Sequence, residues 1–214
     1  MKYRVQLVPP NLRQRPGYPL TPTSITVHNT ANPDATAANH ANYLAGGDRV
    51  ASWHICVDDV EAVMSIPLNE QAWHTGTNAG NKSSIGVEVC EFTDPKRHAQ
   101  SERNAALLVA QMLDGTAPTA FTAEHLGIED VRTHQSWMQY GDSGKYCPRK
   151  ILPHWPVFVA VIDSLMDGDD VNHTIEITVR PDKEAALLKD LTPVLVKHGV
   201  YADALRINDA GQPF

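Results

Sequence analysis

The chain has 214 residues, enough for one domain with a full hydrophobic core and a small additional segment. Hydrophobic residues make up 42% of the sequence and charged residues 20%, which is the composition of an ordinary globular protein. The formal net charge of -7 leaves no basic excess to neutralise phosphates, so we expect no nucleic-acid partner. No basic amphipathic stretch points to a membrane surface either.

The N-terminal region contains no apolar run long enough for a signal-peptide core, and Pro9 and Pro10 interrupt what apolar pattern there is. No later stretch approaches the length of a transmembrane helix. We therefore expect a protein that is synthesised in the cytoplasm without a signal peptide. If it acts outside the cell, it leaves after lysis, through a pore or by another non-signal route.

Hydrophobic patterning predicts alternating strands and helices along most of the chain. The predicted elements are, in order, an arm or loop at 1–23, a strand at 24–28, a helix at 34–47, a β-hairpin at 53–67 that turns near Asp58–Asp59, a polar loop at 75–84, a strand at 84–92, a helix at 100–115, an irregular stretch at 127–150 and a helix at 156–168. This order predicts an α/β fold with a mixed central β-sheet flanked by helices.

The two clearest strands each have an apolar face and a face that carries a chemically active residue. The strand at 24–28 sets His28 opposite its Ile and Val side chains. The strand at 84–92 likewise sets Glu88 opposite its Ile and Val side chains. We expect the apolar faces to pack in the core and the polar faces to carry function.

An acidic break at Asp167–Asp170 precedes the last part of the chain. Beyond it, 173–180 reads as a strand and 182–199 as a helix. We therefore place a domain boundary near residue 170, between a main domain, 1–170, and a small C-terminal α+β module, 171–214.

Two histidines and one cysteine are candidate metal ligands. His28 ends a strand, and His134 and Cys147 lie thirteen residues apart in the irregular stretch. Two imidazoles and a thiolate suit Zn²⁺ and leave a fourth coordination position open. Spacing alone does not establish this, because no compact metal-binding motif is present, and each histidine read by itself is an ordinary core or surface residue.

The cysteines argue against a disulfide-stabilised protein and raise the alternative of a cysteine peptidase. The chain has three, too few and odd in number for a disulfide framework, and we interpret Cys56 and Cys90 as small core residues. A cysteine peptidase using Cys147 and His134 is disfavoured, because such a nucleophile belongs at a helix N-terminus. Here Pro148 follows Cys147 directly, in a stretch without helical pattern.

Five short segments occur along the chain in this order: ITVHNTAN, SWHICVDD, AWHTG, NKSSIGVEVCE and KYCPRK. Together they resemble the amidase-2 family of zinc N-acetylmuramoyl-L-alanine amidases, which includes phage endolysins and Bacillus autolysins. The family shares its fold with animal peptidoglycan recognition proteins. The resemblance covers roughly residues 18–155, and the combination is far more specific than any one segment.

The resemblance assigns roles to residues at matching positions. It implies zinc ligands at His28, His134 and Cys147, catalytic roles for Glu88 and Lys145, and substrate contacts at Asn29, Thr30, His54 and His74. The chemistry agrees with this. A carboxylate at Glu88 can accept the proton of an attacking water and pass it to the leaving amine. Lys145 can stabilise the charge that develops on the carbonyl oxygen.

The implied function is that of a cell-wall hydrolase. Such an enzyme uses zinc-activated water to cut the amide bond between N-acetylmuramic acid and the L-alanine of the stem peptide, and its partner is bacterial peptidoglycan. The alternative is a non-catalytic peptidoglycan-binding receptor on the same fold, but such receptors commonly lack the cysteine ligand and Cys147 is present. We expect the module at 171–214 to bind cell wall or support oligomerisation, with a structural appendage as the alternative.

Overall fold

The computed structural model describes residues 1–138 and 145–167, together with the strands at 175–179 and 205–209. Its main sheet has six strands in the order β1 (Lys2–Val5), β4 (Glu61–Met64), β3 (Ile55–Val57), β5 (Ser84–Val89), β2 (Ser24–Asn29) and β6 (Val131–Thr133). The pairing is parallel throughout except at the β3–β4 hairpin. The prediction of an α/β fold with a mixed central sheet is confirmed.

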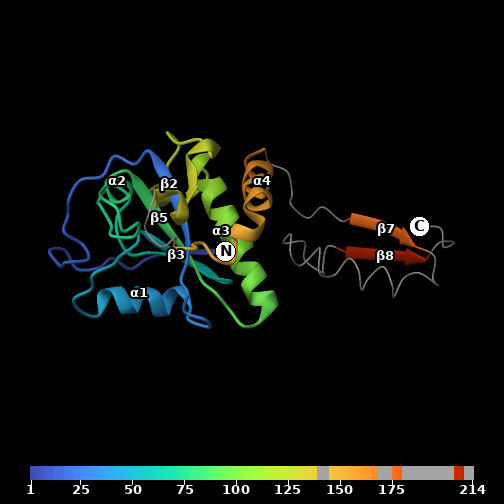
Figure 1. Cartoon of the computed structure of the whole chain (residues 1–214), viewed down its shortest axis with the longest axis horizontal. Helices are drawn as coiled ribbons and strands as arrows, with labels where there is room; N and C mark the ends of the chain where they lie inside the picture. The colour runs from blue at the N-terminus through green and yellow to red at the C-terminus, as the bar shows by residue number, and fades with distance from the viewer. Residues whose placement is uncertain (139–144, 168–174, 180–204, 210–214) are drawn as a thin grey trace.

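Helices cover both faces of this sheet (Figure 1). The α-helices are α1 (Ala37–Ala45), α2 (Asn78–Asn81), α3 (Pro95–Leu113) and α4 (Trp155–Met166), with 3-10 turns η1 (Thr119–Phe121), η2 (Ile128–Asp130), η3 (His134–Trp137) and η4 (Leu152–His154). Helix α1 packs on β3 and β4 from one side, whereas α3 packs on β3, β4 and β5 and is itself covered by α4.

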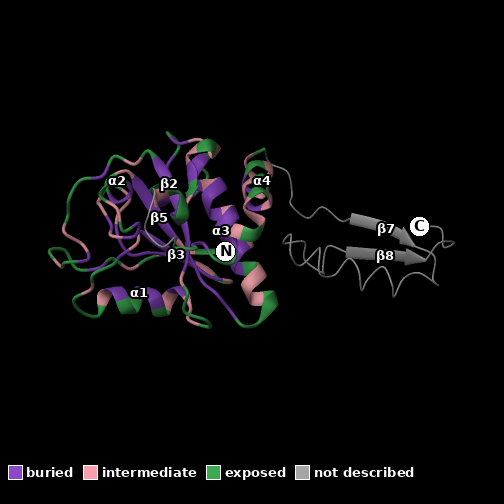
Figure 2. Ribbon diagram, viewed as in Figure 1, coloured by how far each residue is buried: buried purple, intermediate pink, exposed green. Residues whose placement is uncertain are grey.

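The larger part of the core lies between the sheet and the α3–α4 layer. It contains the apolar side chains of β2 and β5, including Val27 and Val87, and the inward face of α3. A smaller cluster lies on the opposite sheet face under α1 and includes Cys56, Cys90 and Phe92. Figure 2 shows the sheet buried between its helices, with exposed residues on their outer surfaces. The alternation predicted for the two strands is therefore confirmed.

Side-chain caps determine where the helices begin. Thr36 caps α1 and forms a reciprocal capping box with Asn39. Asp94 caps α3 by accepting hydrogen bonds from the backbone N–H groups of Lys96 and Arg97. Proline is suited to the first turn of a helix, and α3 begins at Pro95. This is five residues before the predicted start at 100.

Three short elements were not predicted. The arm at 1–23 contributes β1, an edge strand that pairs with β4. The polar loop at 75–84 contains α2, and the irregular stretch at 127–150 contains β6. Each has only three or four residues. Such lengths are too short to display a hydrophobic period, so tertiary pairing rather than local pattern forms them.

The C-terminal part is described only at two strands. β7 (Ile175–Val179) pairs in parallel with β8 (Leu205–Asp209), and β7 matches the strand predicted at 173–180. The helix predicted at 182–199 lies outside the described residues, so the division into 1–170 and 171–214 stays a prediction. Among the described residues, no helix is long and apolar enough to cross a membrane.

Candidate active site

The candidate site lies where parallel strands β2, β5 and β6 end. In the register of β2 and β5, His28 is paired with Glu88, so the two side chains project from the same face of the sheet. His134 follows the last residue of β6, which pairs with β2 from the other side. Ligand sites in open α/β sheets commonly form outside the carboxyl ends of the strands, which is where these residues lie.

Three potential metal ligands converge there. One ligand atom from each of His28, His134 and Cys147 lies within 4.8 Å of the other two, and all three residues are buried. Nδ1 of His28 is 3.8 Å from Sγ of Cys147. Nδ1 of His134 is buried and has no hydrogen-bond partner in the described part of the chain. The unpartnered nitrogen and the soft donor set fit a metal ion such as zinc.

A hydrogen-bonded chain fixes which nitrogen of His28 faces the ligand cluster. Nε2 of His28 lies 2.9 Å from Nδ1 of His74, and Nε2 of His74 lies 3.1 Å from the backbone carbonyl oxygen of Ser84. Burial holds the pKa of both imidazoles well below the ordinary value, so both rings are neutral. The carbonyl only accepts, so His74 donates to it and accepts from His28. The lone pair of His28 is thereby left on Nδ1.

His134 and Cys147 are held by similar contacts. Nε2 of His134 donates to the carbonyl oxygen of Thr75 over 3.0 Å, which leaves Nδ1 of His134 as the free acceptor. The N–H of Gln135 donates to the carbonyl oxygen of Cys147 over 2.9 Å and ties the two ligand segments together. Partners of this kind orient metal ligands and fix their tautomers.

The protonation of the cluster suits a cation. Burial lowers the pKa of His134 to about 4, with a further contribution from the Lys145 charge. Burial, together with the nearby carboxylate of Glu88, raises the pKa of the Cys147 thiol to about 11. The imidazoles are thus available as neutral ligands, whereas the thiolate requires a nearby positive charge to form.

Glu88 and Lys145 stand beside the ligands. Oε1 of Glu88 is 4.0 Å from Nδ1 of His28, and Oε2 is buried without a hydrogen-bond partner among the described residues. Burial raises the pKa of Glu88 to about 7, against the opposing effect of the Lys145 charge. Lys145 is exposed and is close enough to perturb His28, His134 and Cys147 electrostatically.

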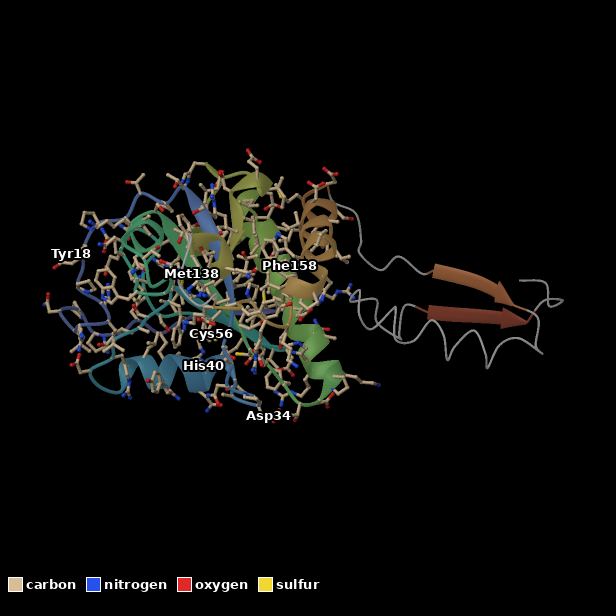
Figure 3. All side chains as sticks on the ribbon, in the orientation of Figure 1. Tyr18, Asp34, His40, Cys56, Met138 and Phe158 are labelled. Carbon is tan, nitrogen blue, oxygen red and sulfur yellow. The ribbon has the colours of Figure 1, made fainter. Side chains whose placement is uncertain are left out.

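A cleft of about 750 Å³ opens next to these residues. The residues that line it are Arg13, Pro16, Tyr18, Val50, Ala51, Trp73, His74, Gly76, Thr77, Asn78, Asn81 and Lys145. His74 lines the cleft and hydrogen-bonds to His28, and Lys145 lines it two residues before Cys147. A molecule bound in the cleft therefore lies beside the potential ligands. Figure 3 shows Tyr18 at the outer edge of the molecule and Met138 nearer its centre.

The four residues expected to contact substrate are placed differently from one another. His74 lines the cleft. His54 does not: it is fully buried, Nε2 lies 2.8 Å from the carbonyl oxygen of Glu70, and Nδ1 accepts the N–H of Gly86 over 2.8 Å. Both ring nitrogens of His54 are therefore bonded within the protein, and a substrate contact at His54 stays a prediction.

Asn29 and Thr30 also face the protein. Oδ1 of Asn29 accepts the N–H of Lys150 over 2.9 Å, and the backbone of Asn29 hydrogen-bonds to Cys147, so Asn29 positions the cysteine loop. The N–H of Thr30 donates to the carbonyl oxygen of Val89 over 3.1 Å, and its hydroxyl is buried without a partner among the described residues. Neither residue lines the described cleft.

Sequence reasoning missed the residues that support the ligands. Gly86 lies under the His74 ring, and a Cβ there would come within 2.7 Å of Cγ of His74. Ser84 and Thr75 act through backbone carbonyl oxygens, which no side-chain motif encodes. Gly86 was the one signal in the sequence, because a glycine inside a strand often marks the close approach of another group.

Comparison with known proteins decides the family. Residues 18–150 match the family described as N-acetylmuramoyl-L-alanine amidase. The chain belongs to this amidase family. It is 42% identical to the N-acetylmuramoyl-L-alanine amidase XlyA of Bacillus subtilis over 160 residues, which cover 72% of this chain and 49% of XlyA. It is 44% identical to XlyB of the same species over 151 residues, 67% of this chain and 43% of XlyB.

Solved structures of family members share the fold. The catalytic domain of XlyA superposes with a TM-score of 0.66 at 39% identity, covering 76% of this chain and 99% of that domain. PlyL superposes with a TM-score of 0.64 at 36% identity, covering 76% of this chain and 97% of PlyL. The chain spans about half the length of the curated relatives it matches. In XlyA the part that this chain resembles includes nearly all of the catalytic domain.

Proposed function

We propose that this chain is a zinc-dependent N-acetylmuramoyl-L-alanine amidase that hydrolyses the amide bond between the lactyl group of N-acetylmuramic acid and the L-alanine of the stem peptide. One observation carries the proposal. The ligands His28, His134 and Cys147 converge beside an unpartnered carboxylate oxygen of Glu88, at a cleft that Lys145 also lines. Family membership supplies the substrate class.

The ligand set fits zinc because two neutral imidazoles and one thiolate give a borderline-soft site with a fourth position open. Zinc held there supplies an electrophile that acidifies water and polarises a carbonyl group. His74 and Thr75 keep the two imidazoles in the tautomers that direct Nδ1 toward the ion. Asn29 holds the cysteine loop in place.

Glu88 is the proton carrier in this account. Its carboxylate accepts the proton of the attacking water and later delivers it to the nitrogen of the leaving L-alanine. The pKa of about 7 suits both tasks near neutral pH, because neither protonation state is strongly favoured. Lys145 stabilises the negative charge that develops on the oxygen of the scissile carbonyl.

The cleft suits an extended polar substrate. Tyr18 and Trp73 provide aromatic surface, with ring centroids 6.2 Å apart, and Arg13 adds a second cation to that of Lys145. Peptidoglycan stem peptides carry carboxylates, so cations along the cleft favour their binding. In this proposal the enzyme acts on the cell wall after lysis- or pore-dependent release, and residues 171–214 form a wall-binding or oligomerisation module.

The direct test combines metal content and hydrolysis on the same samples. We expect the purified full-length chain to hydrolyse a soluble muropeptide, to lose activity when treated with a chelator, and to regain it when zinc is added. Cys147→Ser should hold zinc much more weakly at this site and be inactive. Full zinc-dependent activity in Cys147→Ser would refute the assignment. Binding of muropeptide without hydrolysis by the zinc-loaded chain would favour the receptor alternative.

A further inference from the structure

A second cluster of soft metal ligands lies under α1, apart from the cleft. It consists of His40, Cys56 and Cys90, and one ligand atom from each lies within 4.8 Å of the other two. All three residues are buried, and none lines the cleft. Figure 3 shows His40 next to Cys56, between α1 and the sheet.

The sheet brings the two thiols together. Cys56 lies in the middle of β3, and Cys90 directly follows β5, the parallel neighbour of β3. The N–H of Cys90 donates to the carbonyl oxygen of Val57 over 2.9 Å, which continues the ladder past the end of β5. The two Sγ atoms are 3.5 Å apart, and both cysteines are free thiols.

Helix α1 brings the imidazole to the thiols. Its first residue, Ala37, donates its N–H to the carboxylate of Asp58 over 2.8 Å, which anchors the start of the helix to the β3–β4 turn. Ala37 and Ala41 are fully buried, and their small side chains allow the helix to approach the sheet closely. His40 lies between them on the same inward face.

His40 lacks the partner that a buried imidazole requires. The residue is only 7% exposed, and its Nε2 is buried with no hydrogen-bond partner among the described residues. The nearby carboxylate of Asp58 accepts instead from the backbone N–H groups of Ala37, Val60 and Glu61, and it makes no hydrogen bond to Nε2 of His40. Leaving a buried polar atom unpaired is costly, so this nitrogen points to a ligand that the protein itself does not provide.

We propose that His40, Cys56 and Cys90 form a second metal site, which binds a thiophilic divalent cation of the zinc type. Two thiolates and one neutral imidazole balance the charge of a divalent ion, so the loaded site is neutral overall. A neutral complex is what an apolar surrounding of Ala37, Ala41 and Phe92 tolerates. A monovalent copper ion on the same ligands would leave a net negative charge there.

The spacing of the two thiols requires little rearrangement. Tetrahedral zinc with bonds of about 2.3 Å to sulfur separates two sulfur ligands by roughly 3.8 Å. The observed Sγ–Sγ distance is 3.5 Å, close to that value and far longer than the roughly 2.05 Å of a disulfide bond. The thiols are therefore already spaced as ligands of one ion.

Binding is an exchange of protons for a metal ion. Each of the two thiols releases its proton to solvent and forms a sulfur–metal bond, while the imidazole contributes a lone pair. Because protons compete with the ion for both sulfur atoms, affinity falls as the pH is lowered. The ion would join α1, β3 and β5, which makes the site a structural clamp on the smaller core cluster.

Metal stoichiometry tests this proposal. The reduced, metal-free full-length chain is titrated with Zn²⁺, and bound zinc is measured after removal of the excess. We expect two zinc ions per chain, one ion in Cys56→Ala, one in Cys147→Ser, and two in Val63→Ala. Val63 is a matched control, because it lies in the same buried cluster but carries no ligand atom. Equal zinc content in Cys56→Ala and the parent chain would overturn the proposal.

Cobalt absorption gives a second measurement that does not depend on the folding of Cys56→Ala. In Cys147→Ser the cluster of His28 and His134 has lost its only thiol. Any thiolate-to-cobalt charge-transfer band with added Co²⁺ must then come from Cys56 and Cys90. We expect this band in Cys147→Ser and its loss in the Cys147→Ser, His40→Gln double variant. Absence of the band in Cys147→Ser under reducing conditions, or a Cys56–Cys90 disulfide that persists in reductant, would refute the second site.

Discussion

Nε2 of His28 donates a hydrogen bond to Nδ1 of His74 across 2.9 Å, and this contact leaves Nδ1 of His28, which lies beside Cys147, with its lone pair. His74 is in turn oriented by the carbonyl oxygen of Ser84, at 3.1 Å. His74 thus lines the cleft and also positions a ligand. A residue expected from the sequence to contact substrate is therefore tied to the candidate metal site.

Replacing His74 should weaken metal binding. Without the acceptor at Nδ1, His28 is free to rotate or to adopt the other tautomer, and loss of such a partner typically costs ~10–100-fold in metal affinity. We expect His74→Ala to lose zinc to a competing chelator at a correspondingly lower chelator concentration. His125→Ala is the control, because His125 is exposed and hydrogen-bonds to Pro22 outside this cluster. Equal zinc affinity in the His74→Ala variant and the parent would contradict this role.

Replacing Glu88 by Gln should separate catalysis from metal binding. The variant keeps the shape of the side chain but removes the proton carrier, an effect worth typically ~10²–10⁴-fold in rate. We expect Glu88→Gln to fold and keep its zinc while its turnover of soluble muropeptide falls by that factor. His28→Ala should instead lose metal and activity together. Loss of zinc from Glu88→Gln would make Glu88 a ligand, and near-normal turnover would make another group the base.

The stability of the domain at low pH should depend on Glu102 of α3. Burial alone would raise the pKa of Glu102, but hydrogen bonds from His154 and His98, at 2.9 and 3.0 Å, outweigh it and hold the pKa below 4.5. A carboxyl group whose pKa is lower in the folded than in the unfolded state stabilises the folded state at pH values above its unfolded-state pKa. This stabilisation is lost as the pH falls through the folded-state pKa. The contribution is thus lost below about pH 4.5.

Glu102→Gln should therefore be less stable than the parent near neutral pH, and the difference should shrink as the pH is lowered below 4.5. Denaturant unfolding at a series of pH values measures the difference in the free energy of unfolding. Glu124→Gln serves as the control, because Glu124 is exposed. A difference that stays constant across the pH series would show that Glu102 acts through packing rather than charge.

The C-terminal module should be separable from hydrolysis. The ligand cluster, Glu88 and the cleft all lie before residue 150, so a chain ending at 170 retains every described part of the site. We expect that truncated chain to hydrolyse soluble muropeptide at nearly the rate of the full chain and to bind whole cell walls less well. An unfolded truncated chain would show that 171–214 belongs to the main domain.

The sheet and the ligand set were predictable from sequence because both leave local signals. Alternation in 24–28 and 84–92 set His28 and Glu88 on the faces opposite the core, and the structure pairs these two residues in register. His28 and Cys147 stand in the segments ITVHNTAN and KYCPRK, on which the resemblance to the family rests, and all three potential ligands lie within the matched range 18–150. Strand β1 left no such signal, because four residues in a Pro- and Arg-rich arm form a strand only by pairing with β4.

Contacts between distant segments account for what the sequence did not reveal. His74 reaches His28 across 46 positions, and only the folded chain shows that this contact fixes a tautomer. His54 carries the same Trp–His signature as His74, yet its ring is enclosed and bonded on both sides. Cys56 and Cys90 read as core residues, and they are buried, but their distance to His40 emerges only when α1 packs on the sheet.

The position of the cut bond tests the central claim most directly. Purified cell walls are digested with the zinc-loaded full-length chain, and new N-terminal amino groups and new reducing sugar ends are measured in the same digest. Our account predicts stem peptides with free N-terminal alanine, released in step with digestion and without new reducing ends. New reducing ends with no new N-terminal alanine would mean that the enzyme cuts the glycan, and would contradict the account.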